Sequence, residues 1–114
     1  MIDFIRVMKA LSDPNRVKIL KMLGRKELRV CEIRAVLGLA QPTVSKHLKV
    51  LEAAGLVESS KNGLWVNYRF AEKHESPYSA AMLKHVAQWL SHDKAVQKML
   101  AESEKVDREK ICAS

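Results

Sequence analysis

Polar side chains able to contact DNA bases and phosphates are concentrated in one short segment near the middle of the chain. They are Gln41, Thr43, Ser45, Lys46, His47 and Lys49. Glutamine pairs with adenine, lysine pairs with guanine, and serine or threonine hydroxyls reach bases or phosphates. For His47 two interpretations stay open, a phosphate contact and a local structural cap. An ordinary solvent-exposed helix can carry the same polar residues. The residues before and after this segment are therefore needed to distinguish a DNA-binding face from a merely solvated one.

Apolar residues in the same segment predict the helix that would position this polar face. Val44, Leu48 and Leu51 recur at helical spacing and predict an inward edge. Pro42 suits the first turn of a helix, where its missing N–H costs nothing. Gly55 is typical of a left-handed helix stop. We therefore expect a helix over residues 42–54, with its polar side facing outward.

A β-hairpin is predicted directly after this helix. Strands are expected over residues 56–60 and 65–70, joined by a type I′ turn at Asn62-Gly63. Lys61 and Arg69 flank the hairpin and are candidate phosphate or minor-groove contacts, or else charges that deter edge-to-edge aggregation. A helix that fits the major groove, followed by a hairpin, indicates a winged helix-turn-helix.

The elements before and after this unit complete the predicted fold. Helices are expected over residues 2–12 and 14–23, with Asp13 as a cap and Pro14 in the first turn. A short helix within 27–37 and a Gly38 turn precede the polar helix. Ser76-Pro77 opens a last long helix, whose apolar stripe changes phase near residues 91–93 and predicts a kink or a break. The fold class is mainly α with a β-hairpin wing, in the order ααα-α-ββ-α, over residues 1–106, and 107–114 form a flexible tail.

The charge distribution favours an anionic partner. The formal net charge of the 114 residues is +7. Residues 1–70 hold 13 Lys and Arg against 6 Asp and Glu, whereas residues 71–114 hold 7 of each. The whole excess therefore lies in the part that contains the polar helix. No signal peptide or membrane span is visible, so a cytoplasmic location is expected, and no constellation of nucleophile and base suggests an enzyme.

Three segments resemble the ArsR/SmtB family of metal- and metalloid-responsive repressors. Residues 9–20, KALSDPNRVKIL, are similar to the family's opening ALSDPTRLRIL. Residues 41–57 are similar to its recognition helix, QPTVSxHLxxLxxAGLV, and residues 62–68, NGLWVNY, to its wing. The resemblance implies a homodimer built on the first and last helices, double-stranded DNA with an inverted-repeat operator, and release by an inducer. The apolar residues expected at the dimer interface are Phe4, Met8, Met82, Val86 and Trp89.

The sequence departs from the family at its metalloid site. Arsenic-sensing members carry ELCVCDLC, where three thiolates ligate As(III), and here residues 27–34 read ELRVCEIR. Cys31 is kept, but Arg29 and Arg34 replace the other two cysteines, so three soft ligands cannot be assembled there. A zinc site on the last helix is not visible either. His74, His85 and His92 lack the required spacing and are more simply polar surface residues.

Cys31 and Cys112 are the remaining candidates for a sensor site. A helix start and two arginines beside Cys31 favour its thiolate. The pair would suit a soft metal ion such as As(III) with a third, non-cysteine ligand, a linear soft cation, or a disulfide, whereas Cys31 alone could be a small buried residue. Because disulfides are rare in the cytoplasm, both thiols are expected to be reduced.

Together with the family resemblance, these residues predict a dimeric, sequence-specific repressor released from DNA by a metal(loid) or thiol-reactive signal. Two alternatives stay open. One is a thiol-based redox or soft-metal binding protein. The other is a winged-helix module that binds protein without binding DNA; such a module would not need the positive charge concentrated in residues 1–70.

Overall fold

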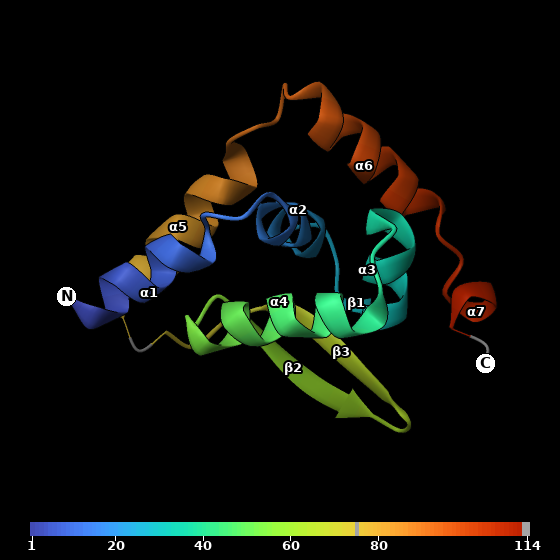
Figure 1. The fold of residues 1–114 in the computed structure, drawn as a ribbon, viewed down its shortest axis with the longest axis horizontal. Coiled ribbons are helices and arrows are strands. Elements are labelled where there is room, and N and C mark those ends of the chain that lie inside the picture. Colours follow the sequence, from blue (N-terminus) through green and yellow to red (C-terminus); the bar gives the residue numbers. More distant parts are fainter. Residues whose placement is uncertain (75, 113–114) are drawn as a thin grey trace.

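A central helix-turn-helix carries a three-stranded sheet on one side and a helical C-terminal arm on the other (Figure 1). The computed structural model describes residues 1–74 and 76–112. The helices are α1 (Ile2–Ala10), α2 (Pro14–Leu23), α3 (Val30–Leu37), α4 (Gln41–Ala53), α5 (Pro77–Gln88), α6 (Lys94–Lys105) and α7 (Arg108–Ile111). The strands are β1 (Leu28–Arg29), β2 (Val57–Asn62) and β3 (Trp65–Phe70). The winged helix-turn-helix prediction is confirmed.

The helix-turn-helix follows the predicted local signals closely. Asp13 caps α2 by accepting hydrogen bonds from the N–H groups of Asn15 and Arg16, at 2.8 and 3.1 Å. Gly38 and Gly55 both adopt the left-handed conformation, with φ of 69° and 75°, and end α3 and α4. Each helix therefore stops where the sequence predicted.

The core lies between α2, α4 and the elements packed around them. Ile19 and Leu20 of α2 are fully buried together with Leu48 of α4 and Leu56 before the sheet. In Figure 1, α2 is seen end-on in the centre, with α4 below it and the arm formed by α5 and α6 above. Among the described residues, no helix has the length and apolar character needed to cross a membrane.

Strand β1 was not predicted. It pairs antiparallel with β3, with Leu28 opposite Tyr68 and Arg29 opposite Asn67, so β3 lies between β1 and β2. A strand of two residues is too short to show an alternating pattern in the sequence. Burial of Leu28, which is 2% exposed, and the pairing with β3 stabilise the segment instead.

The predicted type I′ turn of the wing is wrong. Asn62 pairs with Trp65, so the two loop residues are Gly63 and Leu64 rather than Asn62 and Gly63. A type I′ turn needs positive φ at both central residues. Here Gly63 has φ of 64°, whereas Leu64 is outside the positive region. The turn thus lies one residue later in the chain than predicted, β2 extends to Asn62, and the tip exposes Leu64.

The last helix is broken, which settles the alternative between a kink and a break. α5 ends at Gln88, Leu90 takes φ of 63°, and α6 starts at Lys94. Lys21 in α2 holds this end of α5, because its Nζ donates to the carbonyls of Val86, Ala87 and Trp89 at 2.9, 3.1 and 2.7 Å. Burial, with a smaller effect of the Arg25 charge, lowers the pKa of Lys21.

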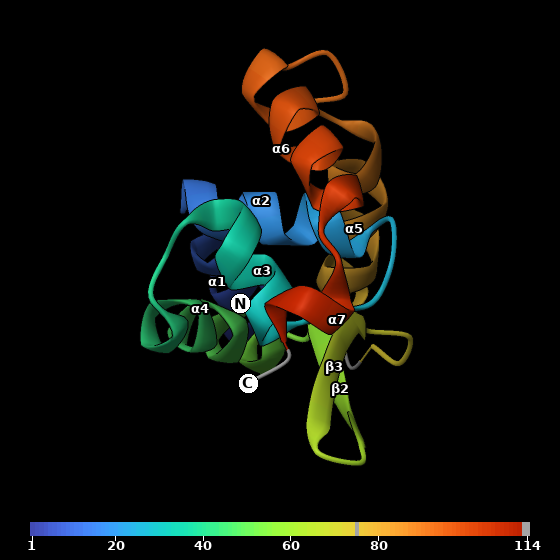
Figure 2. The ribbon, with the colours of Figure 1, turned by 90° about the vertical axis from the view of Figure 1, so that its right-hand side faces the viewer.

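The C-terminal segment differs from the flexible tail that was predicted for residues 107–114. Asp107 caps α7, and Arg108 of α7 forms an ion pair with Glu32 of α3 at 2.8 Å. A disulfide between Cys31 and Cys112 fixes the end of α7 to α3. Figure 2 shows α7 beside α3 and the sheet. Residues 113 and 114 lie outside the described residues.

Replacing Lys21 should destabilise the fold. In a Lys21→Met variant the α5 carbonyls lose their charged donor, so we expect a loss of about 1.5–3 kcal/mol in the free energy of unfolding. Urea denaturation followed by circular dichroism measures this loss. Lys18→Met in the same helix is the matched control, and an equal loss in both variants would contradict a specific role of Lys21.

Candidate nucleic-acid interface and cysteine pair

The polar face of α4 points away from the core. Val44, Leu48 and Leu51 are each 0% exposed, which fixes the rotation of the helix about its axis. The outward side chains are Gln41, Thr43, Lys46 and Lys49, all exposed, and Ser45 is half-buried. In Figure 1 this helix lies below α2 with the wing beneath it, and Figure 2 shows it at the lower left. The predicted DNA-contact residues of α4 therefore form one accessible surface, with His47 as the exception.

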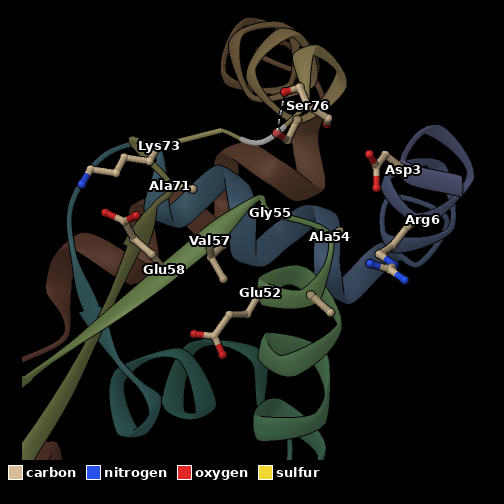
Figure 3. A pocket seen from close by; sticks show the side chains of 12 residues that line it. Asp3, Arg6, Glu52, Ala54, Gly55, Val57, Glu58, Ala71, Lys73 and Ser76 are labelled. Carbon is tan, nitrogen blue, oxygen red and sulfur yellow. Dashed lines mark hydrogen bonds between the residues drawn. The ribbon is translucent and has the colours of Figure 1, made fainter.

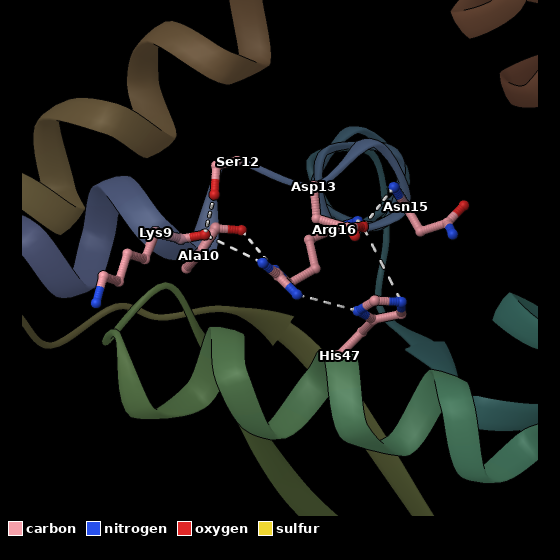
Figure 4. Close-up of polar contacts among 7 residues, drawn as sticks. All are labelled: Lys9, Ala10, Ser12, Asp13, Asn15, Arg16 and His47. Carbon is pink, nitrogen blue, oxygen red and sulfur yellow. Dashed lines mark hydrogen bonds and ion pairs between the residues drawn. The ribbon is translucent and has the colours of Figure 1, made fainter.

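His47 faces the corner between α1 and α2 instead of the outer surface (Figure 4). Its Nδ1 lies 3.3 Å from a guanidinium nitrogen of Arg16, and its Nε2 lies 4.0 Å from the Asp13 carboxylate. Because guanidinium nitrogens only donate, the neutral form of His47 accepts through Nδ1 in this contact and directs its Nε2–H at Asp13. Of the two interpretations of His47, this geometry favours the structural cap.

Arg16 links three elements around this histidine. Its Nε donates to the carbonyl of Ala10 at 2.7 Å, and its Nη2 donates to the carbonyl of Lys9 at 3.1 Å (Figure 4). Burial alone would raise the pKa of Asp13, but hydrogen bonds from the Arg16 and Asn15 N–H groups and the nearby His47 and Arg16 charges lower it overall. The end of α1, the start of α2 and α4 are therefore joined by one polar network.

The two predicted contact residues of the wing differ in their surroundings. Lys61 is exposed near the tip of the hairpin. Arg69 is half-buried and donates to Glu58 at 2.9 Å and to Ser60 at 3.1 Å, with Glu27 3.7 Å away. Because Arg69 is held by two carboxylates, its interpretation as a structural charge is favoured over a phosphate contact.

The cysteine pair is oxidised in this structure. Cys31 and Cys112 form a disulfide with their Cα atoms 5.7 Å apart, which corrects the expectation of reduced thiols. Glu32 is 4% exposed, and one of its carboxylate oxygens accepts from the Arg29 N–H and from Arg108 Nε, at 3.0 and 2.9 Å. The sequence showed both cysteines, but the charge pair next to them joins residues 76 positions apart and has no local signature.

The surroundings of the disulfide do not fit a metalloid ion in this state. A disulfide offers no thiolate, and thiolates are the ligands that As(III) and other soft ions need. Within residues 1–74 and 76–112, no group of three or more His, Cys, Asp and Glu side chains is arranged to hold a metal ion. Arg29 and Arg34 add positive charge beside the sulfur atoms.

A hollow of about 350 Å³ opens beside the disulfide, between α3, the wing and α7. Its lining residues are Arg29, Val30, Cys31, Arg34, Gln41, Leu64, Trp65, Val66, Ile111 and Cys112. The Arg29 guanidinium lies 4.4 Å above the ring of Trp65, a cation–π contact. The hollow therefore connects the disulfide, the start of α4 and the wing.

A second hollow, of about 250 Å³, lies between α1, the end of α4, the sheet and the start of α5 (Figure 3). Its walls carry both signs of charge, with Asp3, Glu52 and Glu58 set against Arg6 and Lys73. This mixture favours no single class of charged ligand.

An apolar surface covers α1, α5 and the segment that follows α5. Ile2 is 74% exposed, Phe4 40% and Trp89 53%, and exposed apolar side chains grouped on neighbouring helices are typical of an interaction surface. Phe4 contacts Tyr78 edge-to-face at 5.4 Å. Of the other predicted interface residues, Met8 and Met82 are half-buried and Val86 is 6% exposed. The surface thus lies on the first helix and on α5, the first part of the predicted last helix, which are the elements that the family resemblance assigns to the dimer.

Comparisons with known proteins agree with this geometry. The family described as "Bacterial regulatory protein, arsR family" matches residues 13–59. The "Arsenic resistance transcriptional regulator ArsR1" of Pseudomonas putida is 38% identical over 92 residues, which cover 76% of this chain and 71% of that protein.

Two solved structures are similar in fold. "Reduced HlyU from Vibrio cholerae N16961" has a TM-score of 0.66 and 30% identity, and the match covers 79% of this chain and 90% of that one. The homodimeric winged helix-turn-helix DNA-binding domain of Mb0332 from Mycobacterium bovis, described as a possible ArsR-family regulator, has a TM-score of 0.63 and 28% identity. That match covers 92% of this chain and 87% of the domain.

The lowered pKa of Asp13 predicts a pH-dependent contribution to stability. An acid with a lowered native pKa stabilises the fold above its unfolded-state pKa, here near 3.8, and loses this effect as the pH falls through the native value. Asp13→Asn keeps a capping oxygen but removes the charge. The variant should therefore be less stable than the natural protein at neutral pH, and in urea titrations the difference should shrink as the pH falls below 3.8 and through the lowered native pKa of Asp13. A difference that stays constant from neutral to acid pH would contradict this assignment.

Proposed function

Because the chain belongs to the ArsR family of bacterial regulatory proteins, we propose that it is a dimeric transcriptional repressor that reads DNA and responds to a thiol-reactive signal. The polar face of α4 points outward beside an exposed wing, and this arrangement is the main support for DNA binding. The excess positive charge of the chain lies in the same part, residues 1–70. This combination suits the phosphate backbone and the major groove of duplex DNA.

The proposed DNA contacts divide into two groups. Gln41, Thr43, Lys46 and Lys49 are exposed on α4 and can approach base edges and phosphates, with Ser45 at the margin of the same face. Lys61 at the wing supplies a further phosphate contact. His47 and Arg69 act by positioning α4 and the wing, because their side chains are already engaged by other residues.

A second copy of the chain is the proposed occupant of the apolar surface on α1 and α5. Phe4 and Trp89 would be buried by pairing, together with the half-buried Met8 and Met82. Mb0332, which is similar over 92% of this chain, is described as homodimeric. Two copies related by a two-fold axis would present two α4 helices to successive major grooves of an inverted-repeat operator.

The disulfide is the proposed switch for DNA binding. It holds Ile111 at the hollow that Gln41 of α4 and Trp65 of the wing also line. A tail fixed there occupies space beside the surface that DNA must approach, so the oxidised form should have the lower affinity. Reduction releases the tail from α3 and restores binding. One relative is named for arsenic resistance, so As(III) at the reduced thiols is the alternative signal.

Removing the two central lysines should weaken DNA binding. We expect Lys46→Ala combined with Lys49→Ala to lower affinity for the DNA upstream of the protein's own gene at least about tenfold, because phosphate and base contacts are lost. Gel-shift titrations at several salt concentrations measure this. The slope of log affinity against log salt should fall by about 0.9 for each phosphate contact removed.

The matched control combines Lys98→Ala with Lys105→Ala, which removes the same charge from exposed positions on α6. This variant should bind almost as the natural protein does. Equal losses in both double variants would show that net charge, rather than the face of α4, determines affinity.

Oxidation should change the DNA affinity of the natural protein but not that of Cys112→Ser. A coupling of about 1–3 kcal/mol corresponds to an affinity about 5- to 150-fold lower for the disulfide form. Fluorescence anisotropy with oxidised and fully reduced protein measures the ratio. Equal affinities would refute the disulfide switch, and release of the reduced protein by As(III) alone would favour the metalloid signal instead.

A further inference from the structure

The hollow beside the disulfide is positively charged. Arg29 and Arg34 both line it, and none of its lining residues is acidic. Glu32, the nearest carboxylate along the chain, is 4% exposed and is neutralised by Arg108. The net field inside the hollow therefore favours an anion.

We propose that this hollow binds an anionic low-molecular-weight thiol, and that Arg29 and Arg34 direct this thiol to the Cys31–Cys112 disulfide. The inference deepens the proposed thiol response and rests on it for its consequence at DNA. It names the class of molecule that resets the oxidised protein.

Arg29 and Arg34 can both bind the carboxylate of such a thiol, but their surroundings differ. Arg29 is held by its contact with Trp65, and within the described residues its buried Nε has no hydrogen-bond partner. A guanidinium fixed on one side by an aromatic ring keeps its remaining donors for a carboxylate. Arg34 is exposed at the mouth of the hollow and forms no ion pair within the described residues. The volume of about 350 Å³ lies within the usual range for small-molecule sites.

Burial of the two sulfur-bearing residues determines which sulfur is attacked. Cys112 is 3% exposed, whereas Cys31 is half-buried. The incoming thiolate therefore forms a bond to Cys31 Sγ, and the electron pair of the broken S–S bond leaves on Cys112 as a thiolate. A second thiolate attacks the outer sulfur of the mixed disulfide and expels the Cys31 thiolate. The balance is two small thiolates consumed, one small disulfide formed and two protein thiolates released.

The charge of the reagent provides the test. The full oxidised chain, without DNA, is treated with 3-mercaptopropionate, 2-mercaptoethanol or cysteamine, which add a negative, neutral or positive group. Release of protein thiols is followed by alkylation and mass spectrometry, and each rate is corrected for the thiolate fraction and nucleophilicity of the reagent. At low salt we expect the anionic thiol to react about tenfold faster than the cationic one, and the preference to shrink at high salt.

Variants of Arg34 test whether the preference for an anionic thiol arises at this hollow. Arg34→Gln should reduce the preference for the anionic thiol several-fold, and Arg34→Lys should retain most of it. Arg6→Gln removes the same charge from α1, away from this hollow, and should leave the preference unchanged. Arg34 is exposed, so these variants should fold, and thermal melting checks that they do.

Two results would overturn the inference. One is a corrected rate that does not depend on the charge of the thiol, and the other is a preference that is the same in Arg34→Gln as in the natural protein. These measurements use no DNA. A charge preference without any effect of the disulfide on DNA affinity would therefore refute the proposed switch while supporting the thiol site.

Discussion

Burial of one edge of α4 is the constraint on which the rest of the site depends. Val44, Leu48 and Leu51 are removed from water completely, each contributing about 1.5–3 kcal/mol of apolar burial. Successive helix residues turn by a fixed angle, so anchoring these three leaves Lys46 and Lys49 no direction except outward. The orientation of the proposed DNA-binding surface thus follows from how the core packs.

The network around Arg16 extends this constraint to the proposed dimer surface. Arg16 holds the last carbonyls of α1 and contacts His47 on α4, while Asp13 caps α2. α1 also carries the exposed Phe4 of the apolar surface. A displacement of α1 on dimerisation would therefore reach α4 through hydrogen bonds with directional geometry, not through apolar contacts alone. His47 is the residue of α4 through which such a displacement would act, because it contacts Arg16 and Asp13.

Local signals predicted the helices well, and long-range contacts account for what the sequence could not predict. Asp13-Pro14 marked the start of α2, and Gly38 and Gly55 marked two helix ends, because caps and left-handed turns depend on nearby residues. The strand β1 exists through pairing with β3, some 40 residues later in the chain, so its two residues carry no pattern of their own.

For the residues of the candidate site, too, local signals were predictable from the sequence and long-range contacts were not. The outward face of α4 could be predicted from its spacing, but the engagement of Arg69 by Glu58 and Glu27 depends on strand register. The ordered tail depends on the Cys31–Cys112 disulfide and on the ion pair between Arg108 and Glu32, and both join residues that are far apart in the sequence. Tertiary contacts of this kind override the expectation that a charged C-terminus is flexible.

The attachment of α7 is built from one strong link and one weaker link. Cys31 and Cys112 are 81 positions apart, and in the chain-entropy account a disulfide closing a loop of that length stabilises the fold by about 4.5 kcal/mol. The ion pair between Arg108 and Glu32 is the weaker link. Its arginine is accessible to water, which screens the attraction, so the pair contributes only about 1 kcal/mol to stability. Once the disulfide opens, the remaining ion pair is worth less than the conformational entropy gained by freeing a few residues, at about 1–2 kcal/mol each. The segment is therefore fixed while the disulfide is closed and should be released when it opens, which is the physical requirement for the proposed redox-dependent switch.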